Sequence, residues 1–522
     1  MKTVSKILFI ACAVFATACN DYLDINTNPN KPTAVDAKLV LPQAQAATAL
    51  ALNAYNTYGS QIGGYAANAG GYGGFNETVS YAYTPNNYAN LWPASYDNLE
   101  DYQYVINKTD GDDLNIYFNA SARIMKVYGM QMLVDAYNDV PYSDALQGAD
   151  VLTPTYDNAA TIYGGLAAEL DRAISDIRKG DGLSVKNKIN AYDIVFAGDM
   201  DEWVKLANTI KLRLMVRGNG KATFSNTAFD AVGFLTEDAL INPGYTRDNN
   251  RQNPMWNTWG FLYTGAAGNK AWIPSTFILT YYDGTKLSDP GRGKAIYYQF
   301  PLTPATGTNQ LGYESTGIPK SPGGSFWYPG ADRTGTSAGN STGVMKGPDA
   351  GYPMFTAAES YFLLAEAAVV GISTPAGSNA KALFESGITE SFKFLYRLPD
   401  NTYSGNPTTA ATTYLTTNAS SKLVQLDLAL TTAEKIEAII TQKYIALNMV
   451  NSHEGWNEYR RTGYPTIFGT AATTTFASIA SQSTRPDRLP SRILYPTSET
   501  QYNPTNVPAG VSSFNSLIFW AK

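Results

Sequence analysis

Aromatic side chains crowd two glycine-rich segments that lack the apolar periodicity of a helix, residues 59–90 and residues 238–352. A flat ring can stack against the apolar face of a sugar, while neighbouring amides, carboxylates and guanidinium groups bond its hydroxyls. So much irregular chain in a compact protein is usually functional. These two segments are therefore the first candidates for a site that binds an uncharged, polar ligand.

The candidate ligand contacts are aromatic residues outside predicted helices, because aromatic residues at helical spacing usually pack in a core. Trp92 and Tyr96, four residues apart, are interpreted as such a packing pair. Asn253, Asp332 and Arg333 are expected as polar neighbours of the second group. The candidate ligand-binding residues are Tyr72, Phe75, Asn76, Tyr83, Tyr88, Trp256, Trp259, Tyr263, Trp327 and Tyr328.

The chain has few of the side chains that catalysis most often uses, which argues against an enzyme. His453 is the only histidine, which excludes Ser-His-Asp triads and multi-histidine metal sites. The only cysteines, Cys12 and Cys19, both lie in the N-terminal segment, so thiol catalysis is excluded as well. The 44 acidic residues leave a carboxylate pair for glycoside hydrolysis open, but no local pair stands out. We expect no catalytic residue and no cofactor, although a structural calcium ion is left open despite the lack of EF-hand spacing.

The composition suits a neutral ligand and argues against nucleic acid. The chain has 36 Tyr, 8 Trp and 21 Phe, whereas charged residues make up only 16%. Tyrosine, asparagine and threonine side chains form hydrogen bonds or stack without needing counter-ions. The formal net charge is −6, and no cluster of lysine and arginine occurs. A protein that binds nucleic acid needs such a cluster to displace counter-ions from the phosphates.

The first nineteen residues have the pattern of an export signal. Lys2 and Lys6 precede an apolar run over residues 7–18 that is too short to span a bilayer comfortably. Small residues precede Cys19, as in a bacterial lipobox, although Ala16 replaces the usual leucine. The alternative is an ordinary secretory signal that happens to end beside a cysteine. The predicted boundaries are a lipoprotein signal peptide over residues 1–18, a tether lipidated at Cys19 over residues 19–34 and a folded domain over residues 35–522.

Apolar residues recur at helical spacing along much of the folded domain. Between Ile162 and Ile177, apolar residues fall three or four positions apart, which predicts a helix with one buried stripe. Thr432 and Glu434 indicate the capped start of a later helix. The predicted helices include residues 39–58, 162–177, 203–217, 361–369 and 436–447.

These helices predict a mainly α fold in which amphipathic pairs stack like tetratricopeptide units. The scaffold is expected to carry long irregular loops, including an insertion over about residues 238–352, and the ligand site on those loops. Residues 401–421, rich in threonine, asparagine and serine, are predicted as a surface loop. The proline-rich tail from residue 484 is predicted as ordered irregular chain or short strand.

Five segments together resemble the SusD/RagB family of nutrient-binding outer-membrane lipoproteins. They occur in the order found in that family and are distributed over nearly the whole chain after the signal. In chain order they are CNDYLD at residues 19–24, LVDAYNDVPYSDA at 133–145, GD at 198–199 with WVKLANTIKLRL at 203–214, AESYFLLAEAA at 358–368 and EGWNEYRRTGYP at 454–465.

The resemblance implies a lipid-anchored protein on the outer face of the outer membrane. Such proteins bind a nutrient oligosaccharide and deliver it to a SusC-like TonB-dependent transporter. Some relatives bind peptides, so a peptide ligand is the alternative within the family. A surface glycan-degrading enzyme and a scaffold that binds only a protein partner are alternatives outside it, because family membership alone does not name the ligand.

Most residues of the shared segments are interpreted as structural. Asp135 and Asp139 suit the end of a helix and the turn that follows. Glu359 and Glu366 lie seven residues apart on one helix face, so we expect them to pair with buried arginine. Arg461 is also expected to pair with a carboxylate, because the fork of a guanidinium group matches the two oxygens of a carboxylate.

Overall fold

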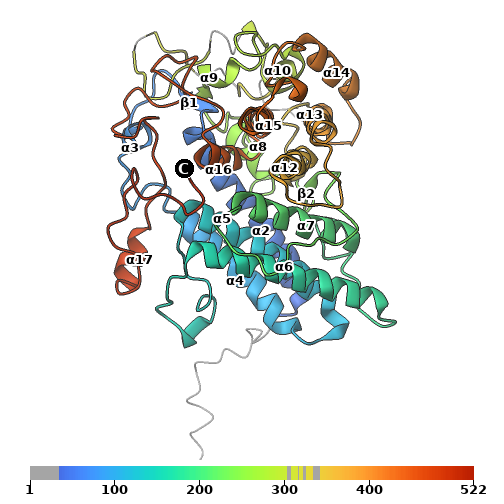
Figure 1. Ribbon diagram of the computed structural model, residues 1–522. Helices are drawn as coiled ribbons and strands as arrows, with labels where there is room; N and C mark the ends of the chain where they lie inside the picture. Colours follow the sequence, from blue (N-terminus) through green and yellow to red (C-terminus); the bar gives the residue numbers. More distant parts are fainter. Residues whose placement is uncertain (1–34, 303–306, 316, 321–324, 333–340) are drawn as a thin grey trace, which may run out of the picture.

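The computed structural model describes residues 35–302, 307–315, 317–320, 325–332 and 341–522 (Figure 1). The predictions for the signal peptide, for Cys19, for the tether and for Arg333 fall outside these residues. The helices are α2 (Ala37–Ile62), α3 (Asn76–Ser80), α4 (Leu91–Thr109), α5 (Ile116–Tyr137), α6 (Ala159–Gly182), α7 (Met200–Arg217), α8 (Pro254–Trp259), α9 (Thr276–Leu279), α10 (Pro290–Ile296), α12 (Ala357–Val370), α13 (Ala380–Tyr396), α14 (Pro407–Thr417), α15 (Thr432–Ala446), α16 (Ser452–Thr462) and α17 (Thr497–Tyr502), with short 3₁₀ turns η1 (Asp113–Asn115), η2 (Gly148–Asp150) and η3 (Leu426–Leu428). The strands are β1 (Ala66–Asn68), β2 (Ala239–Ile241), β3 (Trp272–Pro274) and β4 (Tyr352–Phe355).

The predicted mainly helical fold is confirmed. In α6 the apolar stripe is buried from Ile162 to Ile177, and Asn158 caps the first turn by accepting from two backbone N–H groups. The predicted capped start of α15 is confirmed, but the cap is Thr431, whereas Thr432 is the first residue of the helix. There Thr431 and Glu434 form a reciprocal capping box, which satisfies two backbone donors that the helix leaves unpaired.

The prediction of an irregular surface segment over residues 401–421 is wrong for its central part. Helix α14 occupies Pro407–Thr417, with Asn406 as its cap and proline in the first turn. Threonine hydroxyls donate back to backbone oxygens one turn earlier, as Thr412 does to Thr408 at 3.0 Å. Tyr414 is buried against α13 and α15, and this packing outweighs the weak helix propensity of a threonine-rich sequence.

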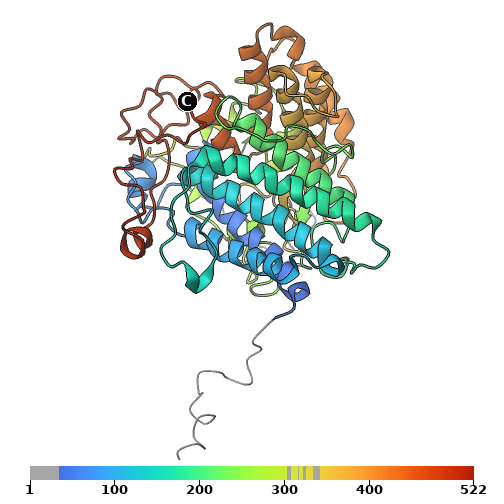
Figure 2. The ribbon, with the colours of Figure 1, turned by 60° about the horizontal axis from the view of Figure 1, so that its bottom comes forward.

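Consecutive helices pack against each other and build a layered scaffold. Helices α4, α5, α6 and α7 lie side by side, from light blue to green in Figure 2, and α12, α13 and α14 form a second set. Helix α2 packs against α4 and α16, while α7 packs against α12 and joins the two sets. Gly59 lets α2 approach α16 closely, because a Cβ atom there would lie 2.1 Å from the backbone nitrogen of His453.

A buried ion cluster links five of these helices. Arg217 of α7 bonds Asp135 of α5 at 2.5 Å and Glu458 of α16 at 3.1 Å, and it also pairs with Glu454. Each of these side chains is at most 2% exposed. The cluster consists of Asp135, Arg213, Arg217, Glu359, Glu366, Lys443, Glu454, Glu458 and Arg461.

The structural interpretation of the shared segments is confirmed by these contacts. Glu366 accepts two hydrogen bonds from Arg461, at 2.7 and 2.8 Å, and Glu359 lies 3.4 Å from Arg213. Asp139 accepts the N–H of Ala159 at 2.8 Å and so fixes the turn before α6. Asp135 is different, because it serves the buried cluster rather than a turn.

Irregular chain gathers on one side of the scaffold. In Figure 1, β1, α3 and the C-terminal segment lie at the left, away from α6, α7, α13 and α14. Strand β1 pairs antiparallel with β3, and β2 pairs antiparallel with β4. Both sheets have only two short strands, so hydrogen bonds of side chains must supply much of the order in these loops.

Candidate ligand-binding face

Four of the predicted ligand contacts form a buried aromatic cluster. Trp259 and Trp327 meet edge to face with ring centroids 5.2 Å apart, and Trp256 meets Tyr328 in the same way at 5.5 Å. None of the four is more than 2% exposed. The expectation that these rings lie on exposed loops is therefore wrong, and in this structure they have no face free for a ligand.

Helix α8 explains why these rings are buried. Trp256 and Trp259 belong to this short helix, which Asn253 caps and Pro254 opens. Asn253 is buried and also donates to the carbonyl of Ala350 at 2.8 Å, so its role is structural. Large rings contribute most to stability when buried, and here they pack the insertion onto α2.

Tyr83 and Tyr88 also lie mainly within the protein. Tyr83 is 6% exposed, and its ring packs against that of Tyr88 with centroids 5.6 Å apart. The ring of Tyr88 meets that of Tyr58 edge to face with centroids 4.8 Å apart, and the Tyr88 hydroxyl donates to the side chain of Gln61 at 3.0 Å. Tyr263 is exposed and lies in the turn between the bridged residues Phe261 and Ala267.

The remaining candidates lie together between β1 and the first residue of α3, which is Asn76. Tyr72 and Asn76 are exposed, and Phe75 is half-buried with its ring 5.3 Å from that of Trp272, edge to face. Trp272 belongs to β3, where it pairs with Asn68 of β1. The loop that contains Tyr72 and Phe75 therefore follows directly on the two-stranded sheet formed by β1 and β3.

A second segment joins this loop. The N–H of Gly70 donates to the carbonyl of Pro319 at 2.7 Å, and the side chain of Asn68 donates to the carbonyl of Tyr313 at 3.1 Å. Tyr313 is 48% exposed. We call the surface that carries Tyr72, Phe75, Asn76 and Tyr313, supported by Trp272, the aromatic face.

A third segment, from the C-terminal part of the chain, borders the aromatic face. The N–H of Ile479 donates to the carbonyl of Leu311 at 3.0 Å. The side chain of Gln310 donates to the carbonyls of Thr470 and Ala477 at 3.1 and 3.0 Å. Phe468, in the same segment, is 66% exposed.

Trp272, Tyr313 and Phe468 are absent from the candidates chosen by sequence. The same criterion could have found Trp272 and Tyr313, because both lie in the segment 238–352 outside the predicted helices, whereas Phe468 lies outside both glycine-rich segments. What the sequence lacks is any sign that residues 70–76, residues 309–315 with 317–320, and residues 466–482 meet in space.

The chemistry available at the aromatic face is stacking and hydrogen bonding. Lys320 and Glu314 are its exposed charged neighbours, and neither takes part in an ion pair with the described residues. Within the described residues no group of three or more histidine, cysteine, aspartate or glutamate side chains could hold a metal ion. The face therefore suits a neutral ligand rich in hydroxyl groups.

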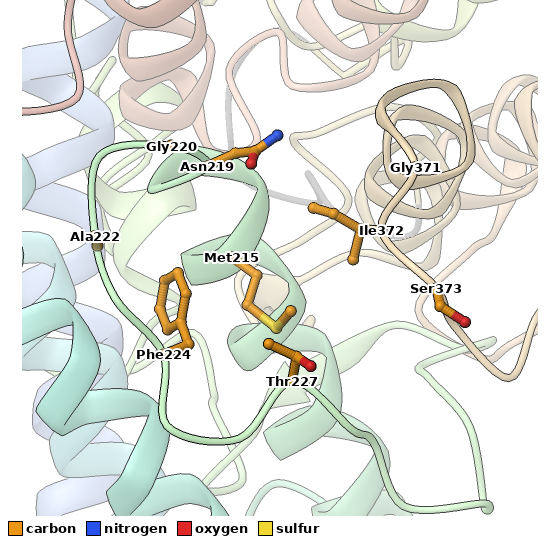
Figure 3. Close-up of a pocket in the computed structure, with 9 residues that line it drawn as sticks. All are labelled: Met215, Asn219, Gly220, Ala222, Phe224, Thr227, Gly371, Ile372 and Ser373. Carbon is orange, nitrogen blue, oxygen red and sulfur yellow. The ribbon is translucent and has the colours of Figure 1, made fainter.

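A separate hollow lies where α7 and α12 end (Figure 3). It has a volume of about 370 Å³, and Met215, Phe224 and Ile372 contribute its apolar lining. Phe224 is the one aromatic ring among the described residues that line it, and no charged side chain joins it. With a single ring, this hollow offers less stacking surface than the aromatic face.

The fold and the aromatic face define a helical scaffold that presents aromatic loops. The family model named SusD-like, with the description "starch-binding associating with outer membrane", matches residues 29–496. This is most of the chain, so the protein belongs to this SusD-like family, and the resemblance to SusD/RagB proteins is confirmed.

Solved structures agree on the fold. A SusD homologue from Bacteroides fragilis is 22% identical with a TM-score of 0.64, and the match covers 94% of this chain and 100% of that one. A chitin-binding SusD homologue from Flavobacterium johnsoniae is 22% identical with a TM-score of 0.67, covering 92% and 99%. A SusD/RagB family protein from Bacteroides thetaiotaomicron is 19% identical with a TM-score of 0.67, covering 93% and 99%. No curated protein matches the chain.

Although α2 has 26 residues, none of the described helices is both long and apolar enough to cross a membrane.

Proposed function

We propose that this protein binds a nutrient oligosaccharide at the aromatic face and delivers it to a SusC-like TonB-dependent transporter. It does so from the outer surface of the outer membrane, where the lipid on Cys19 anchors it. The observation that carries the proposal is the match of a starch-binding, outer-membrane family over residues 29–496. The exposed rings of Tyr72 and Tyr313 on a face with few charges support the same ligand class.

The proposed role needs neither catalysis nor a cofactor. A purified protein that only binds should release no new reducing ends from starch or chitin oligosaccharides. It should also melt at the same temperature in EDTA and in calcium chloride. New reducing ends would instead favour the glycan-degrading enzyme, and a calcium-dependent shift would reveal a structural ion.

Replacing Tyr72 or Tyr313 by alanine is expected to weaken oligosaccharide binding. Loss of one stacking ring should cost about 1–2 kcal/mol, which is roughly a five- to thirtyfold rise in Kd. Isothermal titration with maltoheptaose and chitohexaose measures the change, and a mixture of short peptides tests the alternative ligand class.

Tyr502→Ala is the matched control for both tyrosine variants. Tyr502 is 76% exposed and belongs to α17, outside the aromatic face. Its removal should leave Kd unchanged. If Tyr72→Ala and Tyr313→Ala both bind as tightly as the wild type, the ligand site lies elsewhere. Binding of peptides alone would favour the peptide-binding alternative.

Replacing Cys19 by alanine should release the protein from the membrane fraction of its native host. Several acyl chains bury many CH₂ groups at about 0.8 kcal/mol each, so their loss removes the proposed anchor. Fractionation and labelling with radioactive palmitate measure the outcome. Cys12→Ala is the control, because Cys12 precedes the proposed cleavage point and should not affect anchoring. A Cys19→Ala protein that stays on the membrane would contradict the lipid anchor.

A further inference from the structure

Two buried asparagines converge on the backbone of the turn that carries Tyr313. Asn68 donates to the carbonyl of Tyr313 at 3.1 Å, and its side-chain oxygen accepts the N–H of Gly312 at 2.8 Å. Asn309 donates to the same carbonyl of Tyr313 at 3.0 Å. Both asparagine side chains are buried, whereas the ring of Tyr313 is half exposed.

The two asparagines are also tied to each other and to the scaffold. The side chain of Asn309 donates to the backbone carbonyl of Asn68 at 3.0 Å. The backbone carbonyl of Asn309 accepts the N–H of Thr276, at the start of α9, at 2.9 Å. Asn68 itself lies in β1, where it pairs with Trp272. The turn is therefore bonded to β1 directly and to the start of α9 through Asn309.

The turn needs this support because its backbone is sharply bent. Gly312 has a φ of +79°, and a Cβ atom there would lie 2.2 Å from the hydroxyl of Ser478. Only glycine suits both conditions. No strand or helix includes residues 309–315, so the carboxamides supply the hydrogen bonds that regular structure supplies elsewhere.

We propose that Asn68 and Asn309 are positioning residues of the aromatic face, which hold Tyr313 so that its ring is in place before a ligand arrives. This inference rests on the proposed oligosaccharide binding. A ring that is already ordered loses less conformational entropy on binding, so the ligand is held more tightly than by a mobile loop. Neither asparagine needs to touch the ligand.

Asn56 provides a matched control for Asn68. It is equally buried, it donates to the carbonyl of Met449 at 2.9 Å, and it accepts the N–H of Ser452 at 2.8 Å. It therefore makes the same two kinds of bond, but between α2 and the segment that leads from α15 into the first residue of α16. Asn68→Ala and Asn56→Ala should lower the melting temperature by similar amounts. Only Asn68→Ala should weaken binding of chitohexaose or maltoheptaose, by about five- to tenfold.

A double-mutant cycle with Tyr313→Ala separates positioning from a general loss of structure. Once the ring is gone, Asn68→Ala should cause no further rise in Kd. The proposal is overturned if Asn68→Ala weakens binding equally with and without Tyr313, or if it leaves Kd unchanged while Tyr313→Ala raises it.

Hydrogen exchange tests the same inference without a ligand. Amides of residues 313–315 should exchange faster in Asn68→Ala than in the wild type, and Asn56→Ala should leave them unchanged. If the wild type binds no oligosaccharide but exchange responds in this way, the proposed function fails while the support of the turn stands. Unchanged exchange in Asn68→Ala overturns the positioning role whatever the ligand is.

Discussion

Replacing Arg217 by alanine is expected to lower the free energy of unfolding by about 3–5 kcal/mol, because it leaves buried carboxylates without their cation. Arg217 is 1% exposed and pairs with Asp135, Glu454 and Glu458. Those three side chains come from α5 and α16, so the variant loses a link between helices distant in sequence. Urea unfolding followed by circular dichroism measures the loss.

The cost of Arg217→Ala should shrink as the pH falls. Burial raises the pKa of Asp135, and the nearby Arg217 is the largest influence that lowers it. Without Arg217 this pKa rises further above the value in the unfolded chain. A carboxyl group with a raised pKa destabilises the fold at high pH, where it is charged. This destabilisation is lost as the pH falls and the group takes up a proton. The difference in stability from the wild type should therefore be smaller at pH 5 than at pH 8.

Arg172→Ala is the matched control for the buried arginine. Arg172 bonds Asp110 at 2.8 Å, but both side chains are more than half exposed. A pair of this kind contributes less than about 1 kcal/mol. If Arg172→Ala and Arg217→Ala lower stability equally, the buried cluster does not hold the helices together.

Replacing Gly59 by alanine is expected to be nearly as damaging. The added Cβ atom would lie 2.1 Å from the backbone nitrogen of His453 and 2.3 Å from its Cα. Backbone atoms cannot swing aside as a side chain can, so α2 and α16 must move apart. Overpacking of this kind costs roughly 1–3 kcal/mol or more, and thermal unfolding measures it.

Gly182→Ala tests whether the close approach, rather than loss of a helical glycine, causes the damage. Gly182 ends α6, and a Cβ atom there meets nothing within 4 Å. Alanine is the better helix former by about 1 kcal/mol, so this variant should be as stable as the wild type or more stable. A Gly59→Ala protein that also keeps its stability would show that the two helices can separate at little cost.

The helical scaffold could be predicted well because its signals are local. A buried stripe, as from Ile162 to Ile177, and a capping box, as at Thr431 and Glu434, depend on residues only a few positions apart. Helix α14 was missed because its stability comes from burial of Tyr414 by other helices, which a threonine-rich window does not reveal.

The candidate site was predicted only in part, because exposure is not a local property. Tyr72, Phe75 and Asn76 do lie on the aromatic face, although ligand contact stays a prediction for each of them. Trp259 and Trp327 come from similar glycine-rich surroundings, yet their rings pack together in the core. The partner that buries an aromatic ring is distant in sequence, so composition cannot separate the two cases.

The sequence alone therefore determined the family, the mainly helical fold and the shortage of catalytic histidine and cysteine, since these follow from ordered motifs, short-range periodicity and composition. The tertiary structure decided which rings face solvent and which chain segments meet. Contacts such as Asn68 with Tyr313, or Arg217 with Glu454, join residues more than 200 positions apart, and only the folded chain brings them within bonding distance.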